Sequence, residues 1–113
     1  MNTNRWLSAV LFALAFGTAP ATRAADDLIF TLTIENHKFS PEELVVPAGK
    51  KFKLMVKNLD ATAEEFESHD LKREKVIAGK SQATLNLGPL KAGSYKFVGE
   101  YNEKTAKGRI VAK

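Results

Sequence analysis

The segment that decides the fold closes the chain, where residues 94–113 read SYKFVGEYNEKTAKGRIVAK. Tyr95 and Phe97 alternate with polar residues, which predicts a strand with one buried face. A polar loop over residues 100–103 follows, and Gly108 leads into a closing strand over residues 109–112. Loops that join strands are where small β-proteins carry binding residues, so this loop is the first candidate for a metal site.

The rest of the chain repeats short alternating segments between turns. Apolar residues alternate with polar or β-branched ones over residues 28–34, 44–47, 52–57 and 83–87. Residues 71–77 give a weaker strand signal, and no segment of useful length has a helical period. Gly49 and the Gly- and Pro-containing run at 88–93 are typical of turns. We therefore predict an all-β protein, a Greek-key β-sandwich of about seven strands.

The first 24 residues have the composition of a secretory signal peptide. Arg5 supplies a positive start, residues 6–16 form an apolar run that is short for a membrane span, and small residues follow up to Ala24. We predict a signal peptide over residues 1–24, a domain over residues 25–113 and a periplasmic location, without membrane insertion of the mature chain. The alternative is that the segment remains as an N-terminal anchor.

Composition and charge exclude several classes of function. The chain of 113 residues contains no cysteine, which excludes disulfides and thiolate chemistry. Its formal charge is +4, and loss of Arg5 and Arg23 would bring the domain close to neutrality, so we expect no nucleic-acid binding. No nucleophile, base and orienting residue occur at a recognisable spacing, so a hydrolytic enzyme has little support.

Several motifs resemble known proteins. FSP at 39–41, LVVPAG at 44–49, GSYKF at 93–97 and GRIV at 108–111 resemble cupredoxins, and among them the EfeO-type cupredoxin-like domains of bacterial iron transport. EEFES at 64–68 and GEYNEKTA at 99–106 are similar to the small periplasmic FtrB-like component of ferrous iron uptake systems. The resemblance implies two partners, a periplasmic iron- or copper-binding protein and an inner-membrane iron permease complex.

The resemblance also implies which positions would hold a type 1 copper ion. The two histidine positions fall on Glu64 and Asn102, the cysteine position on Gly99, and the methionine position near Ala106. Type 1 copper needs a thiolate and imidazoles, and these residues provide neither. We therefore predict a cupredoxin-like domain without type 1 copper.

The sandwich implied by the resemblance gathers four candidate metal ligands at one end of the molecule: His37, Glu64, Glu100 and Glu103. One imidazole with several carboxylates suits iron, manganese or Cu(II) better than Cu(I). We predict that these residues form a labile iron site. The protein would bind ferrous iron or assist its oxidation, and pass it to the permease, so that any enzymatic role is accessory.

The same residues have other interpretations. His37 can be a surface histidine beside a turn, and the acidic run can be a solvated sheet edge. Within residues 64–68, Glu64 shares the inward parity of Phe66, whereas the outer face carries a second candidate group, Glu65, Glu67 and His69. The alternative for the whole protein is a metal-free interaction module that docks on a periplasmic iron- or copper-binding partner.

Overall fold

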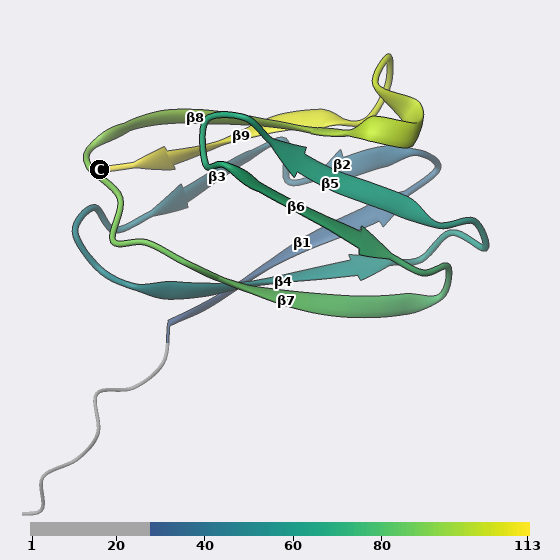
Figure 1. The fold of residues 1–113 in the computed structure, drawn as a ribbon, viewed down its shortest axis with the longest axis horizontal. Helices are drawn as coiled ribbons and strands as arrows, with labels where there is room; N and C mark the ends of the chain where they lie inside the picture. Colours follow the sequence, from purple (N-terminus) through teal and green to yellow (C-terminus); the bar gives the residue numbers. More distant parts are fainter. Residues whose placement is uncertain (1–27) are drawn as a thin grey trace, which may run out of the picture.

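A computed structural model describes residues 28–113 as two facing β-sheets (Figure 1). The first sheet has the strand order β2-β1-β4-β7, and the second has the order β3-β9-β8-β5-β6. The predicted all-β sandwich is confirmed, although the described residues form nine strands rather than about seven. The predicted signal peptide and the first three residues of the predicted domain lie outside the described part.

The first sheet consists of β1 (Ile29–Glu35), β2 (Lys38–Ser40), β4 (Phe52–Asn58) and β7 (Ser81–Leu87). β1 and β2 form a tight hairpin in which Glu35 pairs with Lys38. The two turn residues, Asn36 and His37, have φ values of 55° and 59°, because a two-residue hairpin turn matches the twist of its strands only with left-handed backbone. β2 is therefore a separate short strand.

The second sheet consists of β3 (Glu43–Val46), β5 (Glu64–Ser68), β6 (Arg73–Ile77), β8 (Gly93–Gly99) and β9 (Lys107–Ala112). β8 is its middle strand and pairs antiparallel with β5 and β9. A short 3-10 helix, η1 (Glu100–Asn102), follows β8 and belongs to the loop that leads to β9. The residues 71–77 with a weak strand signal contain β6, the edge strand beside β5.

The core lies between the sheets and is filled by the inward residues of both. In β4, Phe52, Leu54 and Val56 are buried, as the alternation predicts. A cluster of three aromatic rings from β2, β5 and β8 closes one end of the core: Phe39, Phe66 and Phe97, with centroid distances of 4.9 Å to 6.3 Å. Full burial of such a side chain stabilises the fold by roughly 1.5–3 kcal/mol. No helix among residues 28–113 is long and apolar enough to span a bilayer.

Candidate functional site

Three loops meet at the end of the sandwich that carries η1. The Thr105 hydroxyl donates a hydrogen bond of 2.6 Å to the His37 carbonyl, which joins the η1 loop to the β1–β2 turn. The His37 backbone N–H donates 2.9 Å to Asp60 Oδ2, and the Asn36 N–H donates 2.8 Å to Asp60 Oδ1. Asp60 thus ties the β4–β5 loop to the same turn. These two backbone hydrogen bonds are the main reason that the pKa of Asp60 is lowered.

Glu64 lies beneath this end and is only 2% exposed. It points inward because it shares the parity of Phe66 on β5. Its Oε1 accepts hydrogen bonds from the N–H groups of Glu65 (2.9 Å) and Tyr101 (2.8 Å), and its Oε2 accepts one of 2.6 Å from Asn102 Nδ2. The carboxylate therefore links β5 to η1 through two of these hydrogen bonds, and the third lies within β5.

The four positions that the resemblance assigns to copper ligands are in mutual contact. A Cβ atom on Gly99 would lie 2.7 Å from Glu64 Cδ and 2.7 Å from Ala106 Cβ, so the site has no room for a cysteine side chain. The Ala106 N–H donates 2.8 Å to the Asn102 carbonyl, and Ala106 is fully buried. With no thiolate and no imidazole among them, these residues do not fit a type 1 copper ion.

The four ligands predicted from the sequence are distributed differently. His37 is half-exposed, and its Nδ1 lies 3.8 Å from Asp60 Oδ2. It is a surface histidine in a turn, which agrees with its alternative interpretation. Glu64 is committed to its hydrogen bonds with η1, and Glu103 is exposed. Among residues 28–113, one group of at least three acidic or histidine side chains has ligand atoms within 4.8 Å of one another. Of the four predicted ligands, only Glu100 belongs to it.

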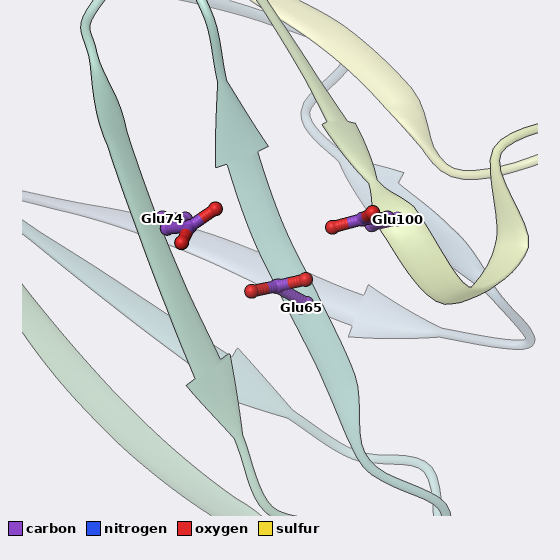
Figure 2. Close-up of side chains that lie close together, drawn as sticks. All are labelled: Glu65, Glu74 and Glu100. Atoms are coloured by element: carbon purple, nitrogen blue, oxygen red, sulfur yellow. The ribbon is translucent and has the colours of Figure 1, made fainter.

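That group consists of Glu65, Glu74 and Glu100 (Figure 2). The three carboxylates come from β5, β6 and η1, and they project from the same outer face of the second sheet (Figure 2). A hydrogen bond with Glu100 raises the pKa of Glu65 to about 7, and partial burial and the neighbouring acidic charges act in the same direction. Close carboxylates share a proton in this way because they cannot all be ionised without strong repulsion.

The outer face also holds the second candidate group. Partial burial raises the pKa of Glu67, and the charges of Glu100 and Glu74 add to this effect, while His69 opposes it. His69 Nε2 lies 3.6 Å from Glu67 Oε1, with the imidazole 89% exposed. The predicted outward parity of this group is therefore correct, and the group is continuous with Glu100 and Glu74.

Glu74 was not among the residues predicted for the site. Between Arg73 and Lys75 it resembles a member of a surface ion pair, but Arg73 instead donates a hydrogen bond of 2.7 Å to the Asn86 carbonyl. Pairing of β5 with β6 places Glu74 directly opposite Glu67. Treating residues 64–77 as a hairpin would have revealed this position, but the charged sequence of β6 concealed the strand.

The sequence matches the cupredoxin-like domain family over residues 7–112, and the chain belongs to this family. An uncharacterized protein of Rickettsia prowazekii (strain Madrid E) is 44% identical over 80 residues, which cover 71% of this chain and 64% of that protein. The chain thus spans less than two thirds of the length of this relative.

Solved structures with the same fold include blue copper proteins. Auracyanin A, described as a "blue" copper protein from Chloroflexus aurantiacus, has a TM-score of 0.63 and 15% identity, with coverage of 78% of this chain and 100% of its own. Amicyanin from Paracoccus versutus has a TM-score of 0.58 and 14% identity, with coverage of 80% and 85%. At such low identity these similarities establish the fold alone.

Proposed function

We propose that this protein is a periplasmic cupredoxin-like component of a bacterial iron uptake system, of the EfeO or FtrB-like kind. It binds ferrous iron through carboxylates, assists its oxidation at most as an accessory, and delivers it to a periplasmic iron- or copper-binding protein and a permease complex. The observation that carries the metal-binding part is the convergence of Glu65, Glu74 and Glu100 within 4.8 Å. The signal-peptide composition of residues 1–24 supports the periplasmic location.

The chemistry of this group favours a hard cation. Carboxylate oxygens suit Fe(II), Mn(II) or Fe(III) better than Cu(I), and this chain offers no thiolate. The hydrogen bond with Glu100, together with partial burial and the neighbouring acidic charges, already raises the pKa of Glu65 to about 7. A divalent cation would replace the proton on Glu65 and neutralise the repulsion among the three groups. Because the carboxylates lie at the surface, the bound ion would be labile, as a transfer protein requires.

Anaerobic titration of the purified protein with Fe(II), with the heat of binding measured by calorimetry, tests the metal site. We expect binding tighter than about 1 mM, weakened at least about tenfold by Glu65→Gln, Glu74→Gln or Glu100→Gln. Glu103→Gln is the matched control, since this exposed glutamate lies on the same loop outside the group. Binding that is lost with His37→Ala but retained with Glu74→Gln would overturn this site in favour of the four ligands predicted from the sequence.

The second candidate function is a metal-free interaction module. It is favoured by the 2.6 Å hydrogen bond between Asn102 Nδ2 and Glu64 Oε2. These two residues occupy the positions of the two histidine ligands implied by the resemblance, and here they bind each other. This function requires that the periplasmic partner be captured equally well in EDTA and in added Fe(II). Capture that depends on metal would count against it.

A further inference from the structure

The edge strands of the two sheets differ in how they resist pairing with another chain. β2 has three residues, β3 has four and ends before Pro47, and β6 carries the charged residues Arg73, Glu74 and Lys75. Short length, proline and charged side chains are common ways to protect a sheet edge. β7 is seven residues long, reads SQATLNL, and contains no proline and no charged residue. Within the described part of the chain, β7 is therefore the unprotected edge.

The backbone of β7 directs hydrogen-bonding groups toward this edge. All seven residues pair with β4 in one unbroken antiparallel register. The Asn86 carbonyl accepts a hydrogen bond of 2.7 Å from Arg73 Nη2, so it points away from β4. The N–H and C=O groups alternate in direction along a strand, so those of Gln82 and Thr84 point the same way as those of Asn86. In the sheet formed by residues 28–113, β7 is the last strand, and no strand lies on that side.

We propose that two copies of this chain pair antiparallel through β7, about a two-fold axis that passes between the two Thr84 residues and is perpendicular to the first sheet. Antiparallel strands exchange two backbone hydrogen bonds at every second pair of opposite residues. With the axis at Thr84, Gln82 lies opposite Asn86 of the second copy, and Thr84 lies opposite Thr84. Each edge-facing residue thus takes part in an exchange, and the first sheets of the two copies become one sheet.

The side chains of β7 fit a second β7 in this register. On the outer face Thr84 meets Thr84 and Gln82 meets Asn86, and side chains of these kinds hydrogen-bond across strands. On the inner face Ala83 lies opposite Leu85, so that an apolar pair extends the edge of the core. Because the strand is uncharged, the pairing brings no like charges opposite each other within it. These matches favour a second copy as the occupant of this edge.

The size of the contact predicts a weak dimer. A single pair of seven-residue strands is at the small end of specific interfaces. The charged β6 edges of the two second sheets face each other across the axis and do not pair, which also keeps the dimer weak. The axis is perpendicular to the sheets, so both acidic groups lie on one side of the dimer. The dimer does not depend on these groups, and a test in EDTA is independent of the proposed metal site.

Sedimentation equilibrium of the purified protein in EDTA, at concentrations up to about 1 mM, measures the dimer. Thr84→Lys sets two ammonium groups opposite each other at the axis, and Thr84→Glu sets two carboxylates there. Each variant should associate at least about fivefold more weakly than the original protein. An equimolar mixture sets opposite charges at the axis and should associate at least about fivefold more tightly than either variant alone. Thr31→Lys, on the same outer face but on β1 inside the sheet, is the matched control and should leave association unchanged.

Thr84→Pro tests the backbone hydrogen bonds. It removes an N–H that faces the open edge and leaves the ladder with β4 intact, so it should abolish the dimer while the circular dichroism is retained. Amide exchange tests the register, because the N–H groups of Gln82, Thr84 and Asn86 should exchange at least about twofold more slowly at about 1 mM than at about 10 μM protein. A monomer at all concentrations would overturn the proposal and leave this edge to a strand of another protein. A dimer that Thr84→Lys does not weaken, or a mixture that associates no better than its components, would overturn it as well.

Discussion

Replacing Glu64 with alanine removes the carboxylate that links β5 to η1. Its three hydrogen bonds come from two backbone N–H groups and from Asn102 Nδ2, at 2.6–2.9 Å. A hydrogen bond to a charged group contributes about 1.5–3 kcal/mol, and loss of the carboxylate also removes the cost of its burial. We expect a net loss of about 3–5 kcal/mol in the free energy of unfolding, a large part of the stability of a small domain.

Urea denaturation in EDTA measures this loss, and a fall in Tm of at least about 12 °C should accompany it. Glu103→Ala, an exposed glutamate on the same loop, is the control and should change stability by less than about 0.5 kcal/mol. Glu64→Gln keeps the shape of the side chain but turns an NH₂ group toward a donor, so we expect about half the effect of alanine. A loss below about 1 kcal/mol for Glu64→Ala would refute the role assigned to this carboxylate.

Three further predictions concern the same end of the molecule and the acidic group. Gly99→Ala places a methyl group 2.7 Å from Ala106 Cβ and should cost about 1–3 kcal/mol in urea denaturation; an unchanged midpoint would contradict the close packing. The pKa of Glu65 is about 7 in the folded chain against an ordinary 4.5, so the folded state retains a proton that the unfolded chain releases. Stability in EDTA should therefore fall as pH rises from about 4.5 to 7, and Glu100→Gln should flatten this slope; an equal slope in the variant would count against the shared proton. The pKa of Asp60 is lowered by folding, so its contribution is present above its ordinary value of 3.8 and is lost as pH falls through the folded value. Asp60→Asn should remove that acid dependence, which thermal unfolding between pH 2 and 5 measures. The same loss of Tm with falling pH in the variant and in the original protein would contradict this role of Asp60.

The buried carboxylate explains how this sandwich keeps its loop in place without a type 1 copper site. In the type 1 arrangement implied by the fold family, a metal ion ties the loop after the penultimate strand to the neighbouring strands. Here Glu64 makes that connection to Tyr101 and Asn102. The same contacts hold η1 so that Glu100 reaches Glu65 and Glu74 on the outer face (Figure 2). The position of Glu100 in the outer group thus depends on the buried Glu64.

The sequence alone determined the fold class and the face on which each strand residue lies. Alternation in β4 and β5 placed Leu54 and Phe66 inside, and it correctly placed Glu64 with them. The lack of cysteine excluded thiolate-bound copper without any coordinates. These conclusions hold because side-chain direction in a strand is a local property with a period of two.

Only the tertiary structure decided which of these side chains meet. Glu65 and Glu100 are far apart in the chain, and they touch because β5 lies beside β8 and η1 follows β8. Glu74 joins them through the β5–β6 register, which puts like charges opposite each other against local preference. Periodicity specifies the face of a strand, but it contains no information about the neighbouring strand. That choice depends on how the whole chain buries its core.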